Sequence, residues 1–267
     1  MRTSLIALAT VSLISIAAPA FADDAAAAPA SPFTVTGGAT LTSDYRFRGI
    51  SQTNKRFAIQ GTLGVSHSSG FYVGTWGSSI DDYVANGGDQ EIDLYAGYKH
   101  TWSGTAVDMG VLYYYYPGSG GVNSDFFEPY INASHSFGPL GVKVGGNFAW
   151  KQHALAYVNP NTGVAHSRGD GFYGYGELSA AVPNTGFSVT GHLGHSFARN
   201  YITFGEKYTD WSVTAAYTWK ALTFSAAYVD TNKDLYSGGP LAGVNFPSAK
   251  NRDISKGGFV GSVGVSF

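Results

Sequence analysis

The chain ends at residues 257–267 with GGFVGSVGVSF, in which every second position from Phe259 to Phe267 holds glycine or an apolar residue. This alternation predicts a β-strand with one apolar face. Chain ends are usually polar and poorly ordered. A strand that stops on a phenylalanine therefore indicates that the end of the chain has a structural use, and the preceding residues should supply the sheet to which it belongs.

Composition favours a membrane β-barrel over a soluble domain. Only 13% of the 267 residues are charged, about half of the ~25% found in soluble globular proteins. The mean hydropathy is nevertheless −0.05, and beyond the N-terminus no run of about 18 apolar residues occurs, which excludes helical membrane spans. A transmembrane barrel places its apolar residues at alternate positions, so it combines few charges with an average hydropathy near zero.

The N-terminus predicts export. Residues 1–22 combine Arg2, an apolar run and an Ala-Phe-Ala sequence before the expected cut, which are the features of a signal peptide. The alternative, a membrane anchor, needs a longer apolar run. Residues 23–32 are rich in alanine and proline and are expected to form a disordered lead-in, which leaves 33–267 as the barrel. The chain lacks cysteine, which excludes a disulfide framework, and its formal net charge of −2 disfavours nucleic acid as a partner.

Twelve segments of alternating character follow Phe33, each long enough to cross a bilayer as a tilted strand of about 9–11 residues. Their approximate spans are 34–47, 57–67, 71–80, 90–101, 105–116, 126–137, 140–151, 172–183, 186–198, 209–219, 221–231 and 257–267. Short turns alternate strictly with longer polar connections, as do the periplasmic turns and extracellular loops of outer-membrane barrels. The sequence thus predicts an all-β fold, a transmembrane antiparallel up-and-down β-barrel of about twelve strands, with ten or fourteen as alternatives.

The polar positions of these strands should face the lumen, because the apolar positions face lipid. In the first segment the polar parity includes Asp44, Arg46 and Arg48, and the apolar parity includes Tyr45 and Phe47. We expect the last two in one of two aromatic girdles at the membrane interfaces. The candidate pore-lining residues are Asp44, Arg46, Arg48, Glu91, Asp93, Lys99, Asp108, Glu128, Lys143, Lys151 and Glu177. They either brace the wall as ion pairs or form a constriction, and their mixed signs favour neither anions nor cations.

Three stretches carry a resemblance to a known family: LTSDYRFRGISQT at 41–53, GGDQEIDLYAGY at 87–98 and DFFEPYINAS at 125–134. The first resembles the opening segment of the TorF family, whose members are inferred to be porins of the Gram-negative outer membrane. The resemblance spans about 33–267 and implies a porin-like role in that membrane without naming a solute. The C-terminal Phe267 resembles the signal by which the barrel-assembly machinery recognises outer-membrane barrels.

Catalytic and cofactor motifs are missing from the sequence. It has no nucleotide-binding loop and no HExxH motif, so neither a cofactor nor a metal site is predicted. Residues 194–198 only half resemble a nucleophile elbow and lie within a predicted strand. His67 and Ser69 have the spacing of an outer-membrane phospholipase pair but fall in a short turn. No catalytic residue is therefore predicted, and an enzyme is the minor alternative.

A function follows from the lumen. Twelve tilted strands give a backbone radius of about 12 Å, and side chains would narrow the passage to about 10 Å or less. We expect passive diffusion of small hydrophilic solutes through this lumen, with outer-membrane lipid around the wall. The alternative is a closed structural or surface-interaction barrel whose extracellular loops are the functional part. The sequence predicts no oligomeric state.

Overall fold

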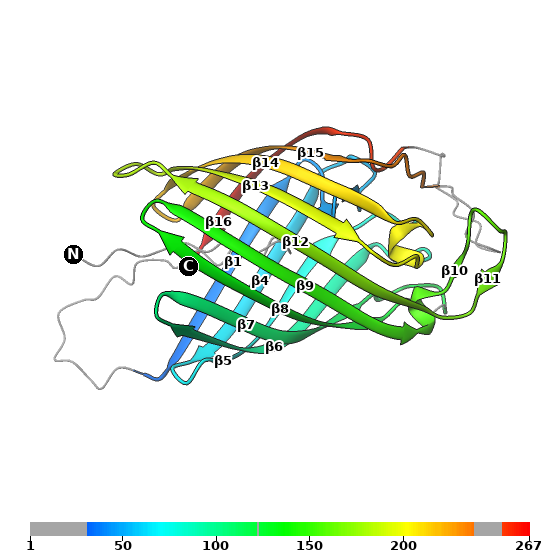
Figure 1. Ribbon diagram of the computed structural model, residues 1–267, viewed down its shortest axis with the longest axis horizontal. Coiled ribbons are helices and arrows are strands. Elements are labelled where there is room, and N and C mark those ends of the chain that lie inside the picture. Colours follow the sequence, from blue (N-terminus) through cyan, green and yellow to red (C-terminus); the bar gives the residue numbers. More distant parts are fainter. Residues whose placement is uncertain (1–30, 122, 238–252) are drawn as a thin grey trace.

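Twelve strands close into one antiparallel barrel in the computed structural model, which describes residues 31–121, 123–237 and 253–267 (Figure 1). The wall strands are β1 (Phe33–Thr42), β4 (Ala58–His67), β5 (Phe71–Ser79), β6 (Gln90–Trp102), β7 (Thr105–Tyr115), β8 (Phe126–Phe137), β9 (Leu140–Gln152), β12 (Gly169–Ala181), β13 (Phe187–Ser196), β14 (Tyr208–Trp219), β15 (Leu222–Thr231) and β16 (Gly258–Ser266). Each pairs with its neighbours in the sequence, and β16 pairs with β1. The predicted fold class and strand number are confirmed.

Short elements occupy the long connections. They are β2 (Arg46–Phe47), β3 (Ile50–Ser51), η1 (His153–Leu155), β10 (Tyr157–Val158), β11 (Ala165–His166) and η2 (Tyr201–Thr203). No helix among the described residues has the length and apolar character needed to cross a membrane. The expected signal peptide at 1–22, nearly all of the expected lead-in at 23–32 and most of the last long connection lie outside the described residues.

The end of the chain is part of the closing seam. The Phe267 backbone N–H donates to the Gly37 carbonyl at 3.0 Å, and the Gly37 N–H donates to the Phe267 carbonyl at 2.9 Å. A Cβ atom on Gly37 would lie 2.5 Å from Cζ of the Phe267 ring, so the ring lies directly against this glycine and would have to shift for a larger residue. The terminal strand thus stays in register to its last residue, as its alternation predicts.

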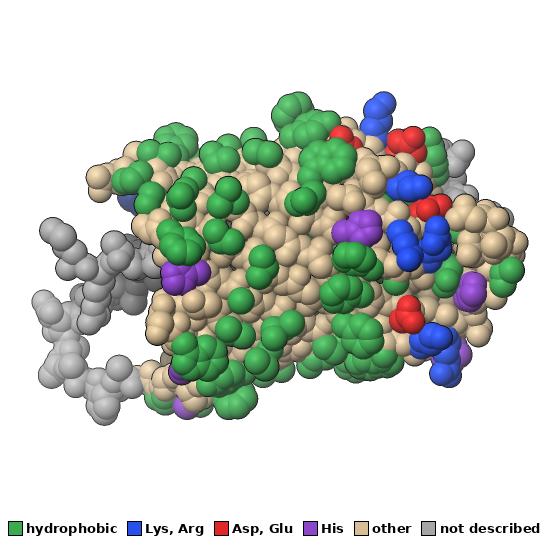
Figure 2. Space-filling model, in the orientation of Figure 1, with side chains coloured by type: hydrophobic (Ala, Val, Ile, Leu, Met, Phe, Trp, Pro, Cys, Tyr) green, Lys and Arg blue, Asp and Glu red, His purple; other side chains and the backbone are tan. Residues whose placement is uncertain are grey.

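The wall is apolar on its outer face. Leu63, Leu94 and Phe259 are among many large hydrophobic side chains that are half exposed or more. In Figure 2 hydrophobic side chains are spread over the visible wall, whereas Lys, Arg, Asp and Glu gather at the long-loop end. This arrangement is the reverse of a soluble protein, in which large apolar side chains are mostly buried, and it is the arrangement of a wall that faces lipid.

The first wall strand is shorter than predicted. β1 ends at Thr42 rather than at residue 47, and residues 43–54, called the inner segment below, fold into the barrel. The reversal requires left-handed backbone at Arg48 (φ 48°) and Gly49 (φ 82°), which a strand cannot contain. The predicted girdle positions of Tyr45 and Phe47 are therefore wrong, because both side chains pack inside the barrel.

Candidate functional site

The long-loop half of the barrel interior is filled by the inner segment. Ile50 and Ser51 are completely buried, and the Ser51 N–H donates to the Ile254 carbonyl at 2.8 Å. Gly49 lies against β14 and β15, where a Cβ atom would approach Thr231 Cγ2 to 2.6 Å. The inner segment is thus packed against the inner faces of β14 and β15 and against the last long connection rather than lying free in a lumen.

Arg48 connects the inner segment to three wall strands. Its guanidinium donates to Glu128 Oε2 on β8 at 2.6 Å and lies over the Tyr173 ring on β12, 4.3 Å from its centroid. Tyr208, at the start of β14, donates its hydroxyl hydrogen to the Arg48 carbonyl at 3.0 Å. Glu128 is only 1% exposed and also accepts from Asn147 Nδ2 at 3.0 Å. The Arg48–Glu128 pair therefore spans the interior as a buried, hydrogen-bonded ion pair.

Two more carboxylates lie on β6 beside this pair. Glu91 accepts a hydrogen bond from the Tyr45 hydroxyl at 2.9 Å. Asp93 is completely buried, and neither of its carboxylate oxygens has a hydrogen-bond partner. Since a buried carboxylate without partners is costly, Asp93 is the one group of this cluster that the packing does not accommodate.

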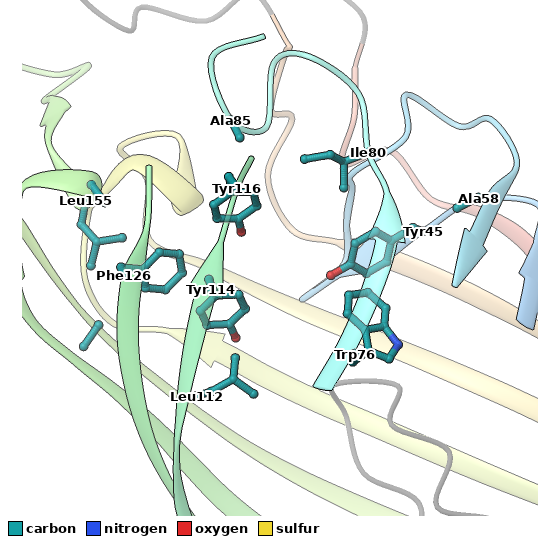
Figure 3. Packing of buried hydrophobic residues seen from close by; sticks show 12 residues of the cluster. Tyr45, Ala58, Trp76, Ile80, Ala85, Leu112, Tyr114, Tyr116, Phe126 and Leu155 are labelled. Atoms are coloured by element: carbon teal, nitrogen blue, oxygen red, sulfur yellow. The ribbon is translucent and has the colours of Figure 1, made fainter. Parts of the chain in front are cut away.

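Aromatic rings enclose the carboxylates. Figure 3 shows Tyr45 and Trp76 facing Tyr114 and Tyr116 across the interior. Tyr45 and Trp76 meet edge to face at 5.3 Å, and the Tyr114 hydroxyl donates to Glu128 at 3.1 Å. A cavity of about 20 Å³ remains between Phe47, Gln52, Val84, Glu91, Tyr116, Tyr201, Ile202 and Phe204. That volume holds about one water molecule, so little free space remains between these eight side chains.

A second polar cluster lies on β9, β12, β13 and β14. The Lys143 ammonium is 3.8 Å from Glu177, and His192 lies between Glu177 at 3.4 Å and Asp210 at 3.1 Å. Tyr173 donates to Asp210 at 3.0 Å. Lys143 and Glu177 are directly opposed in the β9–β12 register. The cluster therefore ties neighbouring wall strands together side by side, and Tyr173 connects it to Arg48.

The structure separates the predicted site residues into three groups. The inner segment carries Asp44, Arg46 and Arg48, which corrects their assignment to a wall strand. Inward positions of the wall carry Glu91, Asp93, Lys99, Asp108, Glu128, Lys143 and Glu177. Lys151 is exposed at the end of β9, where a register shift against Gly169 and Gly171 interrupts the β9–β12 pairing. That any of them lines a conducting pore stays a prediction.

Several of the pairs could not be anticipated. Arg46 donates from Nε to Asp44 at 2.5 Å and from its guanidinium to the carbonyls of Gly49, Ile254 and Lys256. Asp108 accepts from Tyr72 at 2.5 Å and lies opposite Lys99, which is exposed toward the short-turn end. His192 and Asp210 were missed, although their inward parity on β13 and β14 is the same signal that identified Lys143 and Glu177.

An ion pair beyond the ends of the wall strands holds the residues that directly follow the inner segment. Arg56 donates to Asp81 Oδ2 at 2.5 Å. Burial alone would raise the pKa of the Asp81 carboxyl, but the hydrogen bonds from Arg56 and Asp82 and the charge of Arg56 outweigh it and hold this pKa below its usual value. Tyr83, whose hydroxyl contacts the Ser51 carbonyl, has its pKa raised by burial. These contacts attach the loop between β5 and β6 to the inner segment.

The family described as "Bacterial protein of unknown function (Gcw_chp)" matches residues 26–249. No curated protein matches the chain. Among solved structures, the KdgM porin in complex with disordered oligogalacturonate is 9% identical, with 87% of this chain and 97% of that chain covered and a TM-score of 0.52. An outer membrane channel from Pseudomonas putida F1 is 14% identical, with 93% and 99% covered and a TM-score of 0.47. The outer membrane channel DcaP of Acinetobacter baumannii is 9% identical, with 88% and 97% covered and a TM-score of 0.42.

The likeness in fold rests on the first of these structures, since its TM-score alone exceeds 0.5. This likeness shows a barrel fold shared with the KdgM porin, and the apolar outer face of the wall is the arrangement of strands that cross a membrane.

Proposed function

We propose that this chain, which belongs to the bacterial family of unknown function Gcw_chp, is an outer-membrane porin for small hydrophilic solutes. In this proposal the inner segment closes the lumen of the barrel. The expected signal peptide and the aromatic end of the chain support export to that membrane and recognition by the barrel-assembly machinery. The TorF-like stretch at 41–53 supports the same role and coincides with the inner segment. The protein acts in this proposal without catalysing a reaction.

The observation that carries the proposal is the way the inner segment is held. Arg48 reaches the wall through polar contacts: an ion pair with Glu128, a ring face of Tyr173 and the hydroxyl of Tyr208. The wall itself is held by a complete antiparallel ladder that does not depend on them. A displacement of the inner segment would therefore leave the sheet intact. A twelve-stranded wall without it would leave a passage on the order of 10 Å.

Single-channel recording in planar bilayers tests this function. The parent protein is expected to be closed with infrequent openings, because Arg48 crosses the interior. Arg48→Ala removes the guanidinium that links the segment to β8 and β12, and it should increase the open fraction. Arg199→Ala is a matched control, since Arg199 lies in a loop and contacts Glu206 at 3.9 Å outside the interior cluster.

The complete burial of Ile50 and Asp93 favours a second candidate, a permanently closed barrel that acts through its loops. Removal of residues 46–51 distinguishes the two. A porin should then conduct through a passage of fixed size. If parent, Arg48→Ala and the deletion variant all insert as heat-resistant barrels and none conducts at any voltage, diffusion is refuted and the surface-interaction barrel remains.

A further inference from the structure

The short-turn rim of the outer wall carries three histidines that the porin function does not use. His67 ends β4, His100 lies near the end of β6 and His135 near the end of β8, all on the parity of the lipid-facing residues. Alternate strands carry them, so neighbouring histidines are about 12 Å apart along the rim of the tilted strands. Figure 2 shows histidine side chains among hydrophobic ones at this rim of the visible face.

Each of the three imidazoles contacts an aromatic ring of the rim. The ring centroids of His67 and Phe33 are 4.9 Å apart, those of His100 and Trp102 4.4 Å, and those of His135 and Phe137 4.4 Å. Aromatic rings of this kind lie at the level of lipid headgroups. The histidines therefore lie at headgroup depth, where a polar group needs a partner.

The Nδ1 atom of each of these histidines lies within hydrogen-bond reach of a neighbouring protein group. The Ser69 N–H donates to Nδ1 of His67 at 3.2 Å, which makes Nδ1 an acceptor and leaves the ring proton on Nε2. Nδ1 of His135 is 2.9 Å from the Thr105 hydroxyl, and Nδ1 of His100 is 3.5 Å from the Tyr98 hydroxyl. The same tautomer in His100 and His135, with Nδ1 accepting from the Tyr98 and Thr105 hydroxyls, presents Nε2–H of each ring to the surrounding lipid.

Charge at this rim favours an anionic acceptor. The five short turns, at 68–70, 103–104, 138–139, 182–186 and 220–221, contain no Asp or Glu, and one of them contributes Lys220. Phosphate oxygens are the anionic acceptors of lipid headgroups, and hydrogen bonds to an ionised acceptor are about twice as strong as neutral ones. Acidic residues gather instead at the long-loop end (Figure 2).

We propose that His67, His100 and His135 form a binding site for the phosphate groups of phospholipids in the leaflet at the short-turn rim. Each Nε2–H donates to a phosphate oxygen while the neighbouring aromatic ring contacts the glycerol backbone and the first acyl carbons. The proposal needs only that the wall faces lipid, so it is independent of whether the barrel conducts.

The test measures phospholipid retained by the folded full-length protein in detergent, by native mass spectrometry. Dimyristoylphosphatidylglycerol is the probe, and dimyristoylglycerol has the same acyl chains without the phosphate. The parent should retain up to three phosphatidylglycerol molecules and no diacylglycerol. The triple variant His67→Phe, His100→Phe and His135→Phe keeps a ring at each position but removes the donors, and its affinity should fall at least about tenfold.

The double variant His153→Phe and His166→Phe, outside the wall strands, is the control and should bind as the parent does. Heat resistance on gels reports folding, and His100→Phe alone serves if the triple variant does not fold. The proposal is overturned if the folded triple variant retains as much phosphatidylglycerol as the parent does. The same criterion applies to the folded His100→Phe variant where that one is used. Equal retention of diacylglycerol would assign binding to the acyl chains, and displacement by inorganic phosphate would indicate a site for free anions; both outcomes overturn it.

Discussion

Glu128 and Asp93 are both buried carboxylates of the interior cluster, yet their removal should have opposite consequences. Glu128 accepts from Arg48 at 2.6 Å, from Asn147 at 3.0 Å and from Tyr114 at 3.1 Å. Asp93 accepts no hydrogen bond. Glu128→Gln and Asp93→Asn remove the same charge at nearly constant volume, so they isolate the contribution of the partners.

The expected magnitudes follow from these contacts. Glu128→Gln leaves the Arg48 guanidinium buried without a counter-charge, and breaking one member of a buried pair costs about 3–5 kcal/mol. Asp93→Asn breaks no hydrogen bond and removes a charge that repels Glu91 and Glu128, so the free energy of unfolding should be unchanged or higher by about 1 kcal/mol. The two variants should thus differ by about 3 kcal/mol or more.

Urea titration of the folded protein in lipid vesicles, followed by tryptophan fluorescence, measures both variants against the parent. Trp76, one of the five tryptophans, packs on Tyr45 in this cluster and contributes to that signal. Equal destabilisation by the two substitutions, or a larger loss for Asp93→Asn, would refute the reasoning, because it would mean that the unpartnered carboxylate contributes as much as the fully bonded one.

Three further predictions concern topology, the chain end and pH. Tags inserted within 159–164 should be labelled on intact cells and tags within 183–185 should not, and labelling of the second set alone would reverse the proposed orientation. Deletion of Phe267 removes two backbone hydrogen bonds to Gly37. It should lower the amount of protein in the outer membrane by more than a loss of ~1.5–3 kcal/mol of stability, the contribution of one buried ring, would produce. Unchanged levels on membrane fractionation would contradict this prediction. Asp81→Asn should destabilise the loop by about 0.2–1 kcal/mol at pH 7, since Arg56 is largely exposed. The pKa of Asp81 is lowered in the folded protein, so the stability difference between the parent and Asp81→Asn should persist above about pH 5 and vanish as the pH falls below about 3.9, toward the folded pKa. The rate of proteolysis within the loop measures this difference at each pH. A difference that grows toward low pH would contradict the prediction.

The barrel could be predicted from the sequence because alternation and loop length are local properties. The same alternation misplaced Tyr45 and Phe47, since it continues in the sequence after the backbone has left the sheet at Thr42. Gly49 was the local sign of the reversal, but the groups against which it packs, Thr231 and Asp210, lie far along the chain and leave no room for a Cβ atom there. Parity alone could not reveal that contact.

The site was predictable in its residue types but not in its pairs. Inward parity identified Lys143 and Glu177, and their pairing depends on the exact register of β9 and β12. The pairing of Arg48 with Glu128 depends on the inner segment crossing the interior, which no strand pattern encodes. Lys151 shows the opposite failure: its parity is inward, yet the register shift near Gly169 leaves it exposed.

The seam between the first and last strands has a consequence for the order of folding. Gly38 pairs with Ser266, and Arg46 reaches the Lys256 carbonyl 210 residues away. Contacts this distant in the sequence form late, because each requires closing a long loop of chain. The inner segment lies between β1 and β4, so it is synthesised before the strands that surround it. Its burial and the closing of the seam should consequently belong to one late, cooperative step, in which the guanidinium of Arg48 leaves water only when Glu128 is already in place to receive it.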